Sequence, residues 1–346
     1  MADTSSSPIA TLFPGYFALV MATGIVAIGA NQQNVDLLAQ GLYVITVLAY
    51  VVLAVLLASR MIRYWSNFAA DVTNHAKGFA FLTTVAATNV LASASIVIHG
   101  WWNLAWALWW ASLVLWAAFV YTTLIAVVTD RDKPGLQGGI NGSWFLLTVS
   151  TQSIAVVAGL FLTRTDSDAL AFIAIAAFAL GVVLYLIVMT MVFLRWTFHP
   201  LDPTEADPPA WIAAGAVAIT VLAGSNILLA ADQATDRVAR LAPFLEGLVV
   251  TAWATATFWF PLMIAIGIWR HLVRRVPLRY HPSYWAMVFP LGMYGAATYR
   301  MNAAIDFDAL AWLPKIELVV ALCAWTVTFV GLAWHLATSR RTTPHG

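Results

Sequence analysis

Cysteine and charged residues are scarce in this sequence. The one cysteine, Cys323, has no partner within the chain, which excludes an intramolecular disulfide framework and a cysteine-based metal site. Only 10% of the residues are charged, whereas a typical soluble domain has about 25%. The net charge of +1 provides no basic field that would attract nucleic acid. We therefore expect the partners to be small solutes and the lipid bilayer.

Motifs for catalysis or metal binding are also missing from the sequence. It has no HExxH motif, no glycine-rich phosphate loop, and no serine nucleophile elbow with a matching histidine and aspartate. All seven histidines fall outside the apolar runs or at their ends. We expect no enzyme activity, no metal and no cofactor.

Long apolar runs are what the sequence has in abundance. Hydrophobic residues make up 62% of the 346 residues, and the mean hydropathy is +0.82. The runs are about 18 to 26 residues long, the length that an α-helix needs to cross the hydrocarbon of a bilayer. We predict an all-α, polytopic membrane protein whose single transmembrane domain covers residues 1–346. The expected spans lie near 12–30, 37–59, 78–98, 103–128, 140–163, 169–194, 209–231, 244–268, 283–301 and 314–337.

The basic residues indicate how the chain is oriented. With a cytoplasmic N-terminus, twelve of the 17 lysines and arginines fall on the cytoplasmic side and five on the other side. Membrane proteins show this bias in their cytoplasmic loops. The first apolar run is longer than a signal-peptide core and follows a segment without lysine or arginine, so we expect it to be retained. We predict a multi-pass protein of the plasma or inner membrane with both termini in the cytoplasm.

The odd-numbered spans differ from the even-numbered spans. With their first residues, the odd spans contain ten glycines and the even spans five. The mid-span carboxamides Asn89, Gln152 and Asn226 are also on odd spans. A carboxamide that faced lipid would leave its hydrogen-bonding groups unpaired, so the odd helices are expected to face one another or a wet cavity. Packing through small residues, as in any helix bundle, is the alternative.

Several odd spans also begin alike, with an aromatic pair, proline or glycine followed by small and hydroxyl residues. The three openings are FPGYFALVMATG, INGSWFLLTVSTQS and HPSYWAMVFPLG. This repetition predicts five helical hairpins related by pseudo-symmetry, with the odd helices inside and the even helices outside.

Two segments carry a resemblance to a known family. Residues 13–31, FPGYFALVMATGIVAIGAN, contain an aromatic residue, Val-Met and a small-Thr-Gly step. Residues 284–300, YWAMVFPLGMYGAATYR, contain paired aromatics, Phe-Pro, small residues and a basic residue eleven positions after the phenylalanine. Both resemble the tellurite-resistance/dicarboxylate transporter family, which includes bacterial tellurite-resistance proteins, fungal malate and sulfite transporters and plant slow anion channels. With the ten spans, the resemblance covers nearly the whole chain.

The resemblance implies a five-hairpin barrel around a central pore, a homotrimer with one pore per subunit, and a gate made by a phenylalanine on the ninth helix. The matching residue is Phe289. Pro290 cannot donate a backbone hydrogen bond and is expected to bend the helix beside this ring. Ordinary packing of Phe289 is the alternative. The candidate pore-lining residues are Thr23, Gly24, Asn89, Gln152, Asn226 and Gly292.

Arg300 is the basic residue of the second segment. It lies eleven residues beyond Phe289, about 16 Å along a helix, near the outer end of the span. A charge at that depth is costly unless it is paired or wet. We expect Arg300 to attract anions to the outer mouth, and a snorkelling surface arginine is the alternative.

These features predict an anion channel or uniporter for C4-dicarboxylate, sulfite, tellurite or halide. No aspartate or glutamate lies in the central third of any expected span, which favours passive conduction over proton coupling. A proton-coupled dicarboxylate carrier is the runner-up. A membrane-embedded enzyme with its site at His271, Arg274 and His281 is a distant third, since these residues lack the spacing of metal ligands or of a nucleophile and its base.

Overall fold

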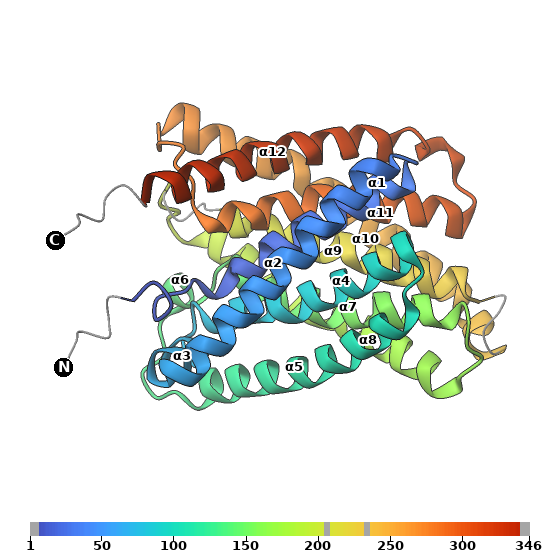
Figure 1. The fold of residues 1–346 in the computed structure, drawn as a ribbon, viewed down its shortest axis with the longest axis horizontal. Helices are drawn as coiled ribbons and strands as arrows, with labels where there is room; N and C mark the ends of the chain where they lie inside the picture. The colour runs from blue at the N-terminus through green and yellow to red at the C-terminus, as the bar shows by residue number, and fades with distance from the viewer. Residues whose placement is uncertain (1–6, 204–207, 232–235, 340–346) are drawn as a thin grey trace.

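Figure 1 shows the chain in a computed structural model, which describes residues 7–203, 208–231 and 236–339. Within these ranges the chain is helical and has no strand, which confirms the all-α prediction. Two short helices, α3 (Trp65–Val72) and α6 (Leu136–Gly139), lie in connections. The long helices are α1 (Ala18–Gln32), α2 (Asp36–Arg63), α4 (Thr83–His99), α5 (Trp102–Thr129), α7 (Leu146–Leu162), α8 (Asp168–Phe198), α9 (Ile212–Leu229), α10 (Asp236–Ile268), α11 (Trp285–Ile305) and α12 (Leu313–Ser339).

Nine of the long helices in the described part of the chain are long and apolar enough to cross a membrane. The tenth, α11, is less apolar, since it contains Arg300 and Asn302 as well as Pro290. It nevertheless packs between α1 and α9 like its counterparts in the other hairpins. The structure is therefore that of a polytopic membrane protein.

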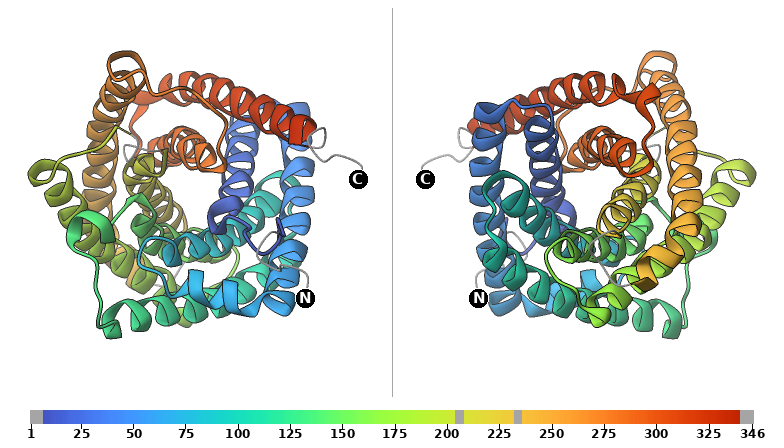
Figure 2. Two further views of the ribbon diagram at one scale, coloured as in Figure 1. Left: turned by 90° about the vertical axis from the view of Figure 1, so that its left-hand side faces the viewer. Right: turned by 90° about the vertical axis from the view of Figure 1, so that its right-hand side faces the viewer.

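The helices form two concentric rings, which Figure 2 shows end-on. Five inner helices contact each other in the order α1, α4, α7, α9, α11, and α11 returns to α1 to close the ring. Each inner helix is followed in the chain by an outer helix that packs against it: α2, α5, α8, α10 and α12. Every outer helix also contacts the inner helix of the next hairpin, and α12 contacts α1. The fold is thus five hairpins arranged around one axis.

Burial separates the two rings. In four of the inner spans, 83–100% of the most apolar window is buried inside the protein, whereas the corresponding share in the outer spans is 11–28%. The outer helices therefore present long apolar faces to the surroundings, as helices in contact with lipid do. The inner helices lie almost entirely within protein, as the distribution of glycines and carboxamides predicts.

A 3₁₀ turn precedes each inner helix and extends it to the length of a membrane span. The 15 residues of α1 rise about 22 Å, and the four residues of its turn add about 8 Å, which together match a bilayer core of about 30 Å. Two of these turns, which begin at residues 78 and 208, lie outside the three similar sequence segments. The five turns are η2 (Pro14–Phe17), η3 (Gly78–Leu82), η4 (Gly142–Phe145), η5 (Pro208–Trp211) and η7 (Pro282–Tyr284).

Hydrogen bonds from aromatic side chains of the outer helices join neighbouring hairpins at four junctions in the described part of the chain. The Trp325 indole of α12 donates to the Thr23 hydroxyl of α1 over 3.0 Å. Equivalent bonds cross three more junctions, from α2 to α4, from α5 to α7 and from α10 to α11. They join Tyr50 to Thr88, Trp116 to Thr151 and Trp253 to Thr298 over 2.9–3.0 Å. These bonds give the indole N–H groups and the Tyr50 hydroxyl of the outer helices a partner at membrane depth.

Close contacts between the turns make Gly142 a sensitive position. A Cβ added to Gly142 would lie 2.1 Å from the carbonyl oxygen of Pro209, which belongs to the backbone of η5 and cannot rotate away. We expect Gly142→Ala to lower the free energy of unfolding by about 1–3 kcal/mol, the usual cost of overpacking. Thermal unfolding of the purified protein in detergent measures this change.

Gly247 of α10 is the matched control. It is exposed, and a Cβ there would meet no atom within 4 Å. Gly247→Ala should raise the free energy of unfolding by about 0.5–1 kcal/mol through helix propensity. Equal effects of the two substitutions would contradict the tight η4–η5 contact.

Candidate functional site

Four cavities follow one another along the axis of the inner ring. A cavity of about 300 Å³ opens at the end where the inner helices begin, and we name it the terminal vestibule. Another of about 300 Å³ opens at the opposite end and is named the distal vestibule. Between them lie two narrow cavities of about 30 Å³ and 10 Å³, each lined by residues from all five hairpins. The axis is therefore wide at both ends and constricted in its middle.

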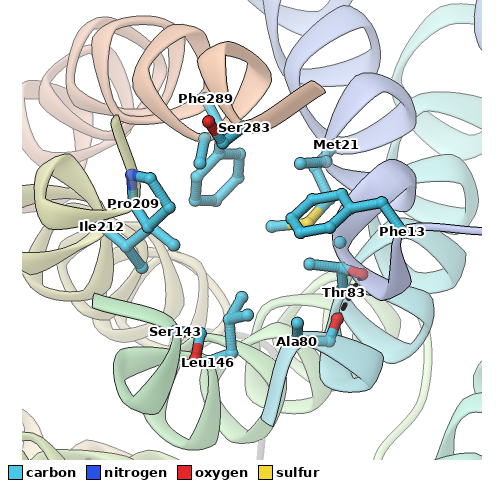
Figure 3. A pocket seen from close by; sticks show the side chains of 13 residues that line it. Phe13, Met21, Ala80, Thr83, Ser143, Leu146, Pro209, Ile212, Ser283 and Phe289 are labelled. Atoms are coloured by element: carbon cyan, nitrogen blue, oxygen red, sulfur yellow. Dashed lines mark hydrogen bonds between the residues drawn. The ribbon is translucent and has the colours of Figure 1, made fainter. Parts of the chain in front are cut away.

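Phe289 lies in the first narrow cavity, shown in Figure 3. The rings of Phe289 and Phe13 and the side chain of Met21 point into the space between the helices. Phe289 is 1% exposed, and its ring lies against Gly215 of α9, where an added Cβ would be 3.3 Å from it. The absence of a side chain at Gly215 makes room for this ring beside the axis.

The second narrow cavity is lined mostly by branched and sulfur-containing apolar side chains. They come from all five inner helices and include Ile25, Val90, Val156, Ile219 and Met293. Three polar residues share the lining: Asn89, Ser93 and Ser153. A constriction of this size and apolarity excludes water unless it widens.

The distal vestibule is polar and contains Arg300. The Nε of Arg300 donates to Oδ1 of Asn226 over 2.8 Å, and the Nδ2 of Asn226 donates to the carbonyl oxygen of Val156 over 3.2 Å. The second bond fixes which way the carboxamide faces. The lining also includes three carboxamides of α1 and its C-terminal turn: Asn31, Gln32 and Asn34.

The terminal vestibule is lined by Lys77, Arg195 and His281 among its polar residues. Lys77 is paired with Asp71 over 2.9 Å, and Arg195 donates to the carbonyl oxygens of Gln137 and Pro200. Within the described residues, every charged side chain that lines the four axial cavities is basic. Electrostatically, such a lining favours anions over cations.

Four of the residues singled out from the sequence line these cavities: Phe289, Asn89, Asn226 and Arg300. The structure brings Asn226 and Arg300 into direct contact at the distal end. Asn89 lies at mid-depth, where its amide donates to Ser153 and its carbonyl accepts from Ser112 of α5. Pro290 lies next to Phe289 with its ring against Gly215.

The other four lie away from the axis and serve contacts between helices. Thr23 accepts the Trp325 hydrogen bond, and Gln152 donates to the carbonyl oxygen of Phe178 on α8. Gly24 faces Thr46 and Val90, and Gly292 faces Ile25 and Val26. None of the four appears in the lining of the axial cavities. A polar or small residue on an inner helix can face a neighbour as readily as the axis, which its residue type alone does not reveal.

Residue types alone also missed several residues that do line the axis, including Phe13, Met21, Thr83 and Ser93. The repeated openings hold the signal that locates them. The first narrow cavity is lined by five residues that occupy equivalent positions in the five repeats: Ala18, Thr83, Leu146, Ile212 and Ala286. Three residues later in each repeat stand Met21, Ala86, Val149, Gly215 and Phe289. Met21 and Phe289 are the two largest side chains at that level.

The residues considered for an enzyme do not converge on one site. His271 is paired through Nδ1 with the carbonyl oxygen of Val276, and the guanidinium of Arg274 lies 5.4 Å from the Trp269 ring. His281 is bonded to Ser283 in the terminal vestibule. The described residues contain no cluster of three or more histidine, cysteine or acidic side chains that could hold a metal ion.

Comparison with known proteins identifies similar chains. The family described as SLAC1, voltage-dependent anion channel, matches residues 11–333. An uncharacterized membrane protein of Mycobacterium tuberculosis is 43% identical over 158 residues, which cover 44% of this chain and 77% of that protein. An uncharacterized transporter of Methanocaldococcus jannaschii is 23% identical over 93% of this chain and 92% of its own length. A sulfite efflux pump of Trichophyton rubrum is 24% identical over 93% of this chain and 90% of its own length.

His281 and Asn141 cap equivalent turns, which leads to a pH-dependent stability. Asn141 Oδ1 accepts from the backbone N–H of Ser143 at η4, and His281 Nδ1 accepts from that of Ser283 at η7. Protonated histidine has no free acceptor nitrogen, so the cap requires neutral His281. Burial lowers the pKa of His281 below its ordinary 6.5. The folded protein should therefore lose stability as the pH falls through about 6.5, and the loss should level off below the lower pKa of the folded state.

The test replaces His281 with the residue used at the other turn. His281→Asn should keep the cap and flatten the fall in thermal midpoint between pH 7.5 and pH 5, as measured in detergent. Asn141→Ala is the matched control, because it removes a cap but leaves the wild-type pH dependence in place. A wild-type pH profile in His281→Asn would refute a titrating cap.

Proposed function

The chain belongs to the voltage-dependent anion channel family, and we propose that it conducts small anions passively through a pore gated by Phe289. Anion transport is what the family match supports, together with the similarity to a sulfite efflux pump. Two of the similar proteins are named as a transporter and an efflux pump rather than as enzymes. Passive conduction, the gate and the solute class of C4-dicarboxylate, sulfite, tellurite or halide are the further parts of the proposal.

The observation that carries the proposal is the constriction at Phe289. Two wide vestibules on one axis are separated by narrow cavities, and the ring of Phe289 lies at the beginning of the narrow part. A large apolar ring there opposes permeation in two ways, since it fills the lumen and makes it too apolar to hold water. Pro290 lacks the backbone N–H that would otherwise donate within α11, and Gly215 of α9 leaves space beside the ring.

The charges at the two ends support an anionic solute. Arg300 lies in the distal vestibule, and Lys77 and Arg195 lie in the terminal vestibule. In the middle the lining has hydroxyl and carboxamide groups but no fixed charge among the described residues. An anion is thus attracted to each mouth without being held at the constriction, as fast conduction requires.

Passive conduction is preferred to proton coupling because the described lining has no carboxylate at the constriction. The proton-coupled carrier remains the second candidate, and Glu317 of α12 is the observation in its favour. Glu317 is half-buried behind Gly295 of α11, where an added Cβ would lie 2.9 Å from the Glu317 Cβ. Accumulation of anion against its gradient when a pH step is imposed on liposomes would select the carrier.

The proposal also covers the orientation of the pore in the membrane and its oligomeric state. We propose that the terminal vestibule faces the cytoplasm, because the basic residues are more numerous at that side. The exposed apolar faces of the outer helices suit lipid and neighbouring copies of the chain, in line with a homotrimer in the plasma or inner membrane.

Truncation of the ring tests the gate. Phe289→Ala should raise anion flux through proteoliposomes by about tenfold or more, since it removes the group that fills and dries the lumen. In an ordinary packed core the same change would cost about 3–5 kcal/mol of stability and would not increase flux. Single-channel or bulk conductance of the purified protein measures the effect.

Phe178→Ala is the matched control. Phe178 is also 1% exposed but lies on the outer helix α8, away from the axis, against Gly224. This substitution should reduce the thermal midpoint without raising conductance. Normal folding of Phe289→Ala with unchanged conductance would rule out the gate.

A further inference from the structure

The hydroxyl of Ser93 differs from the other hydroxyls of its helix. On α4, Thr84, Thr88 and Ser95 all donate to backbone carbonyl oxygens one turn earlier. Serine and threonine in helices usually satisfy their hydroxyls in this way. Ser93 Oγ is buried and has no hydrogen-bond partner among the described residues. A buried polar group without a partner is costly, so its partner is expected to come from outside the protein chain.

Ser93 also occupies a special place on the axis. It is 4% exposed and lines both the second narrow cavity and the distal vestibule. It therefore stands where the wide part of the axis ends and the narrow part begins. A solute that enters from the distal side must lose hydrating water at this level, and a hydroxyl can replace one such water.

Arg300 lines the same vestibule and has further hydrogen-bond donors. Its Nε is bonded to Asn226, and its two terminal nitrogens have no partner among the described residues. No carboxylate in the described part of the chain lines this vestibule. The remaining edge of a guanidinium presents two parallel N–H groups, a geometry that matches two oxygens of an oxyanion.

We propose that the distal vestibule contains a binding site for one small, singly charged anion, in which Arg300 supplies the charge and Ser93 supplies a hydroxyl donor at the floor. Asn226 orients the guanidinium from the other side. One arginine without a neighbouring carboxylate balances one negative charge, so a dianion is only half neutralised there. The site rests on the proposed function, since it assigns the step that precedes the constriction.

Nitrate is a suitable probe because it is singly charged, planar and has oxygen acceptors. The measurement is the thermal midpoint of the purified protein in detergent, titrated with nitrate against gluconate at constant ionic strength. In the wild type the midpoint should rise with nitrate and saturate. Arg300→Gln should raise the half-saturating nitrate concentration by about tenfold, the loss expected for one charge-assisted contact. Sulfate should shift the midpoint less than nitrate does.

Ser93→Ala and Ser95→Ala form a matched pair on one helix. Ser95 is bonded to Leu91 and Tyr43 and lines none of the axial cavities, so Ser95→Ala should keep the wild-type nitrate response. Ser93→Ala breaks no bond within the described protein, so it should fold normally and still lose much of the nitrate response. Wild-type nitrate responses in both Ser93→Ala and Arg300→Gln would overturn the site.

Conductance separates this proposal from the proposed function. In the Phe289→Ala background, Ser93→Ala and Arg300→Gln should raise the nitrate concentration that gives half-maximal current from the distal side. A silent Phe289→Ala protein would remove the gate and leave the midpoint titration to decide the site by itself. Conduction with no nitrate-dependent midpoint shift in any variant would keep the pore and refute the site.

Discussion

Close approach of five helices to one axis is the constraint on which this structure depends. The inner helices meet where side chains are small: Gly159 against Asn226, Gly215 against Phe289 and Pro290, Gly292 against Ile25. Because the ring is tight, the axis is narrow in its middle and widens only at the two mouths. A ring as large as that of Phe289 fits beside the axis because its neighbour on α9 has no side chain. The packing that closes the barrel thus also determines where a plug can lie.

The same constraint explains why most polar groups of the inner ring do not face the axis. In lipid, the hydroxyls and carboxamides must be paired within the protein. Many of them bond to the outer helices or back to their own helix, as Thr23, Thr151 and Gln152 do. The polar groups left along the axis are few, and so are the places where a solute could bind. Polarity on an inner helix therefore serves assembly first and permeation second.

The sequence predicted the helix class, the hairpins and the difference between inner and outer helices, because these follow from the length and composition of apolar runs. It also singled out Phe289 and Arg300 through the family resemblance of residues 284–300, and Asn226 as a carboxamide in an odd span. It could not tell which face of an inner helix meets the axis. An inner helix is surrounded by protein and has no polar side that would mark the axis. The sequence therefore does not distinguish Gly24 and Gly292 from Gly215, although these glycines pack against different neighbours. The register of the five 3₁₀ turns settles that question, and two of those turns, at 78 and 208, do not share the motif of the other three.

The hydrogen bond between Thr23 and Trp325 joins residues 302 positions apart, from the first inner helix to the last outer helix. Synthesis runs from the N-terminus, so α1 is in the bilayer long before α12 exists. Until then, one flank of α1 and the hydroxyl of Thr23 have no protein neighbour. The barrel can close only when the last hairpin arrives, which makes closure a single late event in biogenesis. A chain cut short before the last hairpin, α11 and α12, would leave an open arc of helices with the hydroxyl of Thr23 toward lipid.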